Sequence, residues 1–236
     1  METNLHLGTW LSIGSPVIAE LAALSGFDWV LFDLEHGCAA EASLPDQLRA
    51  VRGTATKGIV RVGAPHPDLI ARVLDWGADG IMVPHVESAA EAEAVVQAAC
   101  HAPKGRRGFS RTVRATDYGL GRHRGDPLLM AQIESRAGVA AAPAIAAVEG
   151  IGVLFVGPAD LRHDLEHSSA AGSPDFDRCL SEVAAATRAA GKEAGILLRD
   201  ASVLDEHVEL GFSHIAIDSD LSILRNAYRS ILSKTP

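Results

Sequence analysis

The stretch GIVRVGAPHPDLIARVLDWGADGIMVP, residues 58–84, contains the unit from which the whole chain is built. An apolar run at 58–62 is followed by a helix-like segment and then by a second apolar run at 80–84. The two runs are almost continuously apolar, which is typical of strands that are covered on both faces by other layers. The stretch therefore predicts a strand, a crossover helix and a second, parallel strand.

The same unit recurs along the rest of the chain. Apolar runs lie at residues 8–12, 29–33, 58–62, 80–84, 128–134, 153–157, 195–198 and 215–218, separated by helix-like segments. Helix starts are marked by Ser15 before Pro16, and by Ser88 and Glu91 at capping-box spacing. Eight strands that alternate with helices predict an α/β fold, a single-domain (β/α)8 TIM barrel over residues 1–236. A doubly wound open sheet is the alternative, because the pattern does not show whether the sheet closes.

Composition and charge exclude several classes of protein. The chain has 236 residues, 47% of them hydrophobic, and a formal net charge of -9, so we expect neither nucleic acid nor a membrane as partner. The cysteines Cys38, Cys100 and Cys179 are scattered, which argues against a disulfide scaffold or a zinc site. No signal peptide and no membrane-spanning stretch is recognisable, and we expect a cytoplasmic location.

Two carboxylates follow neighbouring strands of the predicted barrel. Glu134 ends the fifth apolar run, and Asp160 follows the sixth. Active sites of such barrels lie at the carboxyl ends of the strands, so these two groups are expected to converge, and a divalent ion such as Mg²⁺ or Mn²⁺ would relieve their repulsion. The alternative is structural: Asp160 caps the next turn and Glu134 pairs with Arg136.

Other polar residues follow the strands at the same end. His36 comes just after the second strand, where it is placed for proton transfer with Asp33 as an orienting group; an ordinary loop histidine is the alternative. Arg61 interrupts the third apolar run, which predicts either an oxyanion-stabilising group or a structural ion pair across the barrel. Gln132 alternates with Glu134 and therefore points the same way.

The turn Gly157-Pro158-Ala159 precedes Asp160. Its backbone N–H groups are predicted to receive a carboxylate, because glycine lets a ligand approach the chain closely. The longest segment without a clear helix or strand is 105–127, and loops of this length are often functional. Arg111 and Arg114 in this loop are candidate contacts for an acidic substrate tail.

The order of these motifs resembles the HpcH/HpaI aldolase family, the metal-dependent class II pyruvate aldolases, over nearly the whole chain. The resemblance is carried by GTWLS, FDLEHG, VRV followed by LDWGADGIMVP, KGRRGF, AQIESRAGV and AVEGIGVLFVGPADL. It implies a (β/α)8 barrel that assembles as a homo-oligomer, a hexamer or trimer of dimers, in which the last helix is exchanged between neighbours. The family's serine after GPADL is replaced here by Arg162, which is expected to affect substrate choice or only loop contacts.

The resemblance also implies roles for individual residues. Glu134 and Asp160 match the two metal ligands, and His36 matches the histidine of the catalytic base. Asp75 matches an aspartate that reaches this histidine from an adjoining subunit; the residue pattern alone makes it a solvated turn residue. The remaining matches are Asp33 in the same network, Arg61 on the enolate oxygen, Gln132 on pyruvate and Leu197 in the aldehyde pocket.

The chemistry implied by the resemblance is reversible cleavage of a 4-hydroxy-2-oxo acid to pyruvate and an aldehyde, through a metal-stabilised pyruvate enolate. The cofactor would be Mg²⁺, Mn²⁺ or Co²⁺, and the partners a small-molecule 2-oxo acid and an aldehyde. Two alternatives keep the enolate chemistry, namely an oxaloacetate decarboxylase and a C–C bond-forming synthase. A third alternative is a non-catalytic barrel that binds a 2-oxo acid.

Overall fold

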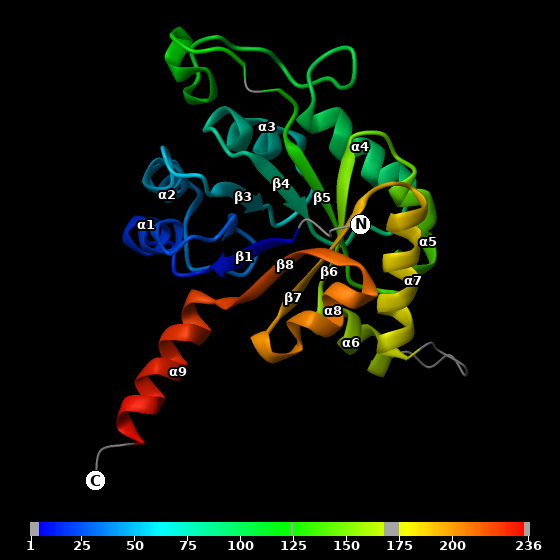
Figure 1. Cartoon of the computed structure of the whole chain (residues 1–236). Helices are drawn as coiled ribbons and strands as arrows, with labels where there is room; N and C mark the ends of the chain where they lie inside the picture. The colour runs from blue at the N-terminus through cyan, green and yellow to red at the C-terminus, as the bar shows by residue number, and fades with distance from the viewer. Residues whose placement is uncertain (1–4, 124, 168–174, 234–236) are drawn as a thin grey trace.

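The computed structural model describes residues 5–123, 125–167 and 175–233, and it contains a closed barrel of eight parallel strands (Figure 1). Each strand pairs with the next in chain order, and β8 closes the barrel by pairing with β1. The strands are β1 (His6–Leu11), β2 (Trp29–Asp33), β3 (Lys57–Arg61), β4 (Gly80–Val83), β5 (Leu128–Ile133), β6 (Ile151–Val156), β7 (Glu193–Leu198) and β8 (Phe212–Ser219). This arrangement confirms the predicted (β/α)8 barrel and excludes the open sheet.

Helices surround the barrel and return the chain from the carboxyl ends of the strands to the amino-terminal end of the barrel. They are α1 (Pro16–Leu24), α2 (Leu44–Ala50), α3 (Pro67–Asp75), α4 (Ala89–Ala99), α5 (Arg136–Ala146), α6 (Pro158–His167), α7 (Phe176–Ala189), α8 (Leu204–Leu210) and α9 (Asp220–Leu232). Helix α1 begins after Ser15 with Pro16 in its first turn, and the Ser88 side chain accepts from the Glu91 amide (3.2 Å). No helix in the described ranges is long and apolar enough to cross a membrane.

Side chains of the strands pack on both faces of the sheet. One buried cluster fills the barrel interior and includes Trp10, Trp29, Ile59 and Phe155, while a larger cluster lies between the strands and the helices. This two-sided burial explains the continuously apolar runs. Glycine makes room for the large interior rings, since a Cβ on Gly8 would lie 2.3 Å from atoms of the Trp29 ring.

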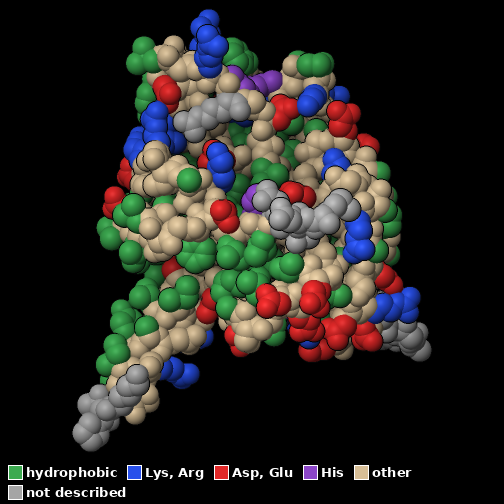
Figure 2. Space-filling model, in the orientation of Figure 1, with side chains coloured by type: hydrophobic (Ala, Val, Ile, Leu, Met, Phe, Trp, Pro, Cys, Tyr) green, Lys and Arg blue, Asp and Glu red, His purple; other side chains and the backbone are tan. Residues whose placement is uncertain are grey.

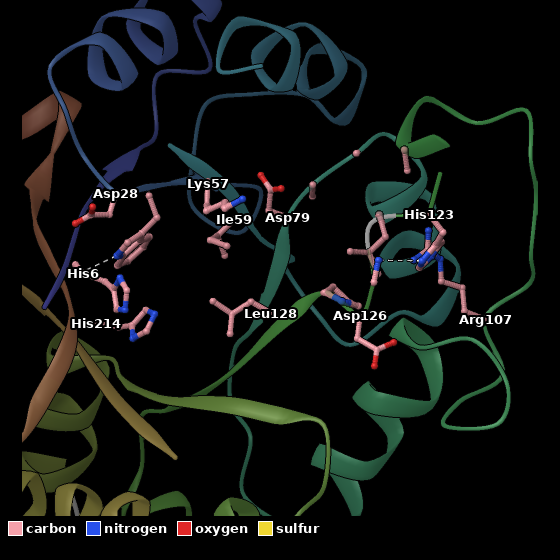
Figure 3. Close-up of a pocket in the computed structure, with 17 residues that line it drawn as sticks. His6, Asp28, Lys57, Ile59, Asp79, Arg107, His123, Asp126, Leu128 and His214 are labelled. Carbon is pink, nitrogen blue, oxygen red and sulfur yellow. Dashed lines mark hydrogen bonds between the residues drawn. The ribbon is translucent and has the colours of Figure 1, made fainter. Parts of the chain in front are cut away.

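The two ends of the barrel differ in what covers them. The segment from Cys100 to Pro127 joins α4 to β5 and therefore lies at the amino-terminal end of the strands. Its described residues include the short 3-10 helix η2 (Arg114–Gly119). Under this segment is a cavity of about 630 Å³, with His6 and His214 on one side and Arg107 and His123 on the other (Figure 3). The carboxyl ends of the strands open at the opposite end of the barrel.

Helix α9 departs from the barrel instead of packing along it (Figure 1). Its start is fixed by Asp220, whose carboxylate accepts the backbone N–H groups of Ser12 (2.9 Å) and Ile13 (3.0 Å). Apolar side chains remain exposed along the projecting helix, including Tyr228 and Ile231 (Figure 2). This helix therefore leaves an apolar surface uncovered within the single chain.

Candidate active site

The predicted site residues at the carboxyl ends of the strands form the next layer above the interior core. Asp33, Arg61 and Gln132 each follow, by two residues along their strand, a side chain that fills the barrel. They therefore point inward like those core residues. Asp33, Arg61 and Gln132 line one cavity of about 470 Å³, together with His36 and Leu197. Closure of the barrel thus brings together residues that are far apart in the sequence.

Arg61 lies at the centre of a buried ion-pair network. Its Nε donates to Asp33 Oδ1 (2.9 Å) and its Nη2 to Asp33 Oδ2 (2.7 Å), while Nη1 lies 2.7 Å from Glu35 Oε2. Burial alone would lower the pKa of Arg61, but the hydrogen bond and charge of Asp33, with Glu35, outweigh it and raise that pKa. A structural ion pair is present, but it joins register partners on the adjacent strands β2 and β3 and does not cross the barrel; it holds the guanidinium at the wall of the cavity.

His36 is exposed at the mouth of the same cavity. The turn that carries it is held by Asp33, whose Oδ1 accepts the backbone N–H groups of Glu35 (3.0 Å) and His36 (3.3 Å). Asp33 thus contacts His36 through the backbone amide and orients the turn. One carboxylate therefore positions both the histidine and the arginine.

Glu134 and Asp160 converge beside Gly157. Glu134 is buried, whereas Asp160 is exposed in the first turn of α6, and both line a second, polar cavity of about 600 Å³. A Cβ on Gly157 would lie 2.6 Å from Glu134 Oε1 and 2.9 Å from Gln132 Nε2. Glycine is therefore required here for these side chains to approach the turn. Asp160 lines both cavities, so the two carboxylates lie at their junction.

The electrostatics of Glu134 fit a bound cation. Burial raises its pKa to about 7 against the charge of His85, and the charge of Asp160 adds to the rise. Glu134 Oε1 and Gln132 Oε1 are buried without a hydrogen-bond partner in the described part of the chain. No group of three or more His, Cys, Asp or Glu that could hold a metal occurs there. The donor set is two carboxylates, which suits an oxygen-preferring divalent ion that keeps open positions.

His85, Glu35 and Arg199 are polar residues to which the sequence reasoning assigned no role. His85 follows β4 in a left-handed conformation (φ 53°), with its Nδ1 3.0 Å from Glu134 Oε2 and its Nε2 3.6 Å from Glu35 Oε1. Arg199 follows β7 and lines the cavity that contains Arg61. Position after a strand selects Glu35 and His85 from the sequence without giving them a role, whereas Arg199, which follows β7, was not selected.

Asp75 lies at the other end of the barrel within this chain. It ends α3, which runs from the carboxyl end of β3 back to the start of β4, and its carboxylate pairs with Arg107 Nη2 (2.5 Å). The loop that carries Arg111 and Arg114 lies at that end too, where Arg114 donates to the carbonyls of Trp76 and Leu48. Any role of these residues at an active site requires a second subunit.

Glu134 is expected to make the metal-free protein less stable as the pH rises. Its unfolded pKa is near the ordinary 4.5 and its folded pKa about 7, so between these values the folded state binds more protons. The free energy of unfolding should therefore fall by about 3 kcal/mol across this window. Glu134→Gln removes the effect. Urea unfolding in EDTA at pH 5 and pH 8 measures it.

The matched control is Glu166→Gln, which changes an exposed glutamate on α6. This variant should keep the pH dependence of the wild-type protein. A divalent ion should restore the stability of the wild type at pH 8, because it neutralises the buried carboxylate. Parallel pH dependences of the wild type and Glu134→Gln would contradict the prediction.

The fold and the cavity define a barrel enzyme whose carboxylates and buried arginine face one small-molecule site. Comparison with known proteins identifies the class. The model of the HpcH/HpaI aldolase/citrate lyase family matches residues 6–227. The chain therefore belongs to this family and is a carbon–carbon lyase, an aldolase.

Individual relatives agree with this assignment. The chain is 36% identical to the hydroxypyruvate/pyruvate aldolase of Pseudomonas aeruginosa, over 97% of this chain and 88% of that protein. It is 33% identical to the 5-keto-4-deoxy-D-glucarate aldolase of Klebsiella pneumoniae subsp. pneumoniae, over 97% and 91%. A solved structure of a family member from Burkholderia cenocepacia J2315 superposes with a TM-score of 0.91 at 34% identity, covering 98% of this chain and 95% of that one.

Proposed function

We propose that this aldolase reversibly cleaves a 4-hydroxy-2-oxo acid to pyruvate and an aldehyde through the enolate of pyruvate. The observation that carries the proposal is the junction of Glu134 and Asp160 beside the cavity that contains Arg61 and His36. Two carboxylates, a guanidinium and an imidazole are the groups that enolate formation from a 2-oxo acid needs. The relatives' names, which include pyruvate and a keto-deoxy sugar acid, support this substrate class.

Glu134 and Asp160 would hold the divalent ion, Mg²⁺, Mn²⁺ or Co²⁺. When bound, such an ion acts as a Lewis acid toward the keto oxygen of the substrate. Gln132 lies beside Glu134 and presents an amide toward the same place. The backbone of Gly157, Pro158 and Ala159 lines the cavity and would receive the substrate carboxylate, because no side chain at Gly157 blocks its approach.

His36 would remove the methyl proton of pyruvate, because an imidazole can act as a general base and this one lies at the cavity mouth. The negative charge that develops on the enolate oxygen would be stabilised by Arg61, which Asp33 holds in a fixed orientation. Leu197 lines the same cavity and would contact the aldehyde. In the cleavage direction the same groups act in reverse order.

The proposed assembly is a homo-oligomer, a hexamer or trimer of dimers. The projecting helix α9 and its exposed apolar residues support exchange of this helix between neighbours. Asp75 lies at the end of the barrel opposite to the site in its own chain, so it cannot reach His36 of that chain. In the proposed assembly it would approach His36 of an adjoining subunit.

Two other functions use the same groups. An oxaloacetate decarboxylase and a C–C bond-forming synthase would also form a pyruvate-type enolate next to Arg61, and analysis of the products separates them from an aldolase. A barrel that only binds a 2-oxo acid would not need His36, so binding without turnover in the wild-type protein, unchanged in a His36 variant, would favour it.

The test is exchange of the methyl protons of pyruvate with D2O, followed by NMR. Wild-type protein treated with EDTA should not exchange, and Mg²⁺, Mn²⁺ or Co²⁺ should restore exchange. This measurement requires no knowledge of the aldehyde. Absence of exchange with all three ions would overturn the proposal in favour of another 2-oxo acid or a binding role.

A further inference from the structure

The cavity that contains Arg61 carries two further arginines at its outer end. The charged residues that line it are Asp33, His36, Arg61, Asp160, Arg162 and Arg199. Asp33 is already paired with Arg61, and Asp160 belongs to the carboxylate pair beside Gly157. The charge that remains for a ligand at the outer end therefore comes from Arg162 and Arg199.

Arg199 is held in place by a carboxylate on the neighbouring strand. Its Nη1 donates to Asp218 Oδ1 at 3.2 Å. The Arg199 side chain is 63% exposed whereas the Asp218 side chain is only 10% exposed, so a largely buried acid orients an accessible arginine that lines the cavity. Arg199 comes just after β7, two residues beyond Leu197, and both residues line the cavity.

A β-bulge places Asp218 in this position. Gly8 of β1 pairs with Ala216, but Trp10 pairs with Ser219, so β8 contains one extra residue between these pairs. Asp218 lies in the bulge with a left-handed backbone (φ 52°). The carbonyls of the bulge are satisfied by the Thr9 hydroxyl, which donates to Ile217 (3.0 Å) and Asp218 (3.3 Å).

Such a conformation is costly for a residue other than glycine, and it persists only where the surroundings impose it. Bulges beside active sites commonly re-aim a side chain. Here the bulge changes the direction of the Asp218 side chain, which forms an ion pair with Arg199. The bulge therefore serves to fix a guanidinium over the cavity.

Arg162 is held by a different contact. It lies on the second turn of α6, and its Cζ is 3.5 Å from the centre of the Phe176 ring at the start of α7. This cation–π contact restrains the side chain without neutralising its charge. Two restrained guanidiniums, Arg162 and Arg199, and the carboxylate of Asp218 thus lie at the outer end of the cavity, and together they have a net positive charge.

We infer that Arg199, oriented by Asp218 and assisted by Arg162, determines specificity by binding an anionic group on the aldehyde partner. The inference rests on the proposed function, because it assigns the anionic group of the aldehyde to the part of the same cavity that pyruvate leaves open. Guanidinium groups bind carboxylate and phosphate through paired, charge-assisted hydrogen bonds. The favoured aldehydes therefore carry a carboxylate or phosphate a few atoms from the carbonyl.

The experiment compares pairs of aldehydes in which one member carries an anionic group and the other does not. Condensation with pyruvate is measured for succinic semialdehyde against butanal, and for glyceraldehyde 3-phosphate against glyceraldehyde. The wild type should prefer the anionic member of at least one pair. A preference in the first pair indicates a carboxylate ligand, and a preference in the second pair indicates a phosphate ligand. Arg199→Met should reduce this preference in kcat/KM by about 10–100-fold, the usual effect of losing a charge-assisted contact.

Asp218→Gly tests the positioning role. Glycine accepts the left-handed backbone, so the strand is retained while the partner of Arg199 is removed. KM for the anionic aldehyde should rise with little change in kcat. The control is Arg178→Met, which changes an exposed arginine on α7 that pairs with Glu182 and should preserve the wild-type preference.

The possible failures are distinguishable. If the wild type does not exchange the methyl protons of pyruvate with any of the three ions, the proposed function itself is wrong. If exchange occurs but the wild type uses charged and neutral aldehydes equally, the inference about Arg199 is overturned. An unchanged preference in Arg199→Met would overturn it as well.

Discussion

Asp160→Ala is expected to slow the exchange of pyruvate methyl protons by roughly 10²–10³-fold, corresponding to the several kcal/mol that a Lewis acid contributes to enolate formation. Asp160 is one of two carboxylates at the junction of the cavities, and Glu134 alone would leave the ion with one protein ligand. Stability should change little, because Asp160 is exposed in the first turn of α6 and its loss only relaxes the repulsion on Glu134. NMR exchange and urea unfolding measure the two effects separately.

A second readout separates loss of the ion from loss of chemistry. Binding of Mn²⁺, followed by its electron paramagnetic resonance signal, should weaken in Asp160→Ala. Glu166→Ala removes an exposed acid from the same helix and should keep both the exchange rate and the affinity for Mn²⁺. Wild-type exchange in Asp160→Ala would exclude this aspartate as a metal ligand and return it to the role of a helix-turn residue.

Arg61→Met is expected to reduce both stability and exchange. The substitution leaves the buried carboxylates of Asp33 and Glu35 without their cation. Breaking a buried ion pair in this way costs about 3–5 kcal/mol of folding free energy. The exchange rate should fall by about 10²–10³-fold, as when one oxyanion-stabilising donor is removed.

The stability loss in Arg61→Met should be larger at pH 8 than at pH 5, because an unpaired buried carboxylate can take up a proton at the lower pH. Arg61→Lys retains the charge but loses the paired hydrogen bonds to Asp33, so it should recover part of the stability and little of the exchange. Near-normal exchange in a folded Arg61→Met protein would show that the arginine is only structural.

The strands were the most predictable part of the fold. Residues 29–33 were expected as a strand and are β2 with the same bounds. Such runs are recognisable because both faces of each strand are buried, one in the barrel and the other under the helices. Helix starts such as Ser88 with Glu91 were equally visible, since a cap depends only on residues within one turn.

The candidate site was predictable only where a residue was unusual for its surroundings. Arg61 inside an apolar run and the carboxylates after two strands were found in this way. His85 and Arg199 were given no role, because a polar residue after a strand is ordinary until its neighbours are known. The bulge that carries Asp218 could not be predicted, since nothing in IAIDSD, residues 215–220, indicates an extra residue relative to β1.

Local pattern alone therefore determined the eight strands, their alternation with helices and the end of the barrel at which chemistry is expected, because each depends on residues close together in the chain. Tertiary structure decided which groups meet. It paired Arg61 with Asp33 and Glu35, brought Glu134 to the Gly157 turn and set Arg199 against Asp218. These contacts arise from barrel closure and strand register, which join segments far apart in the sequence and so leave no local signal.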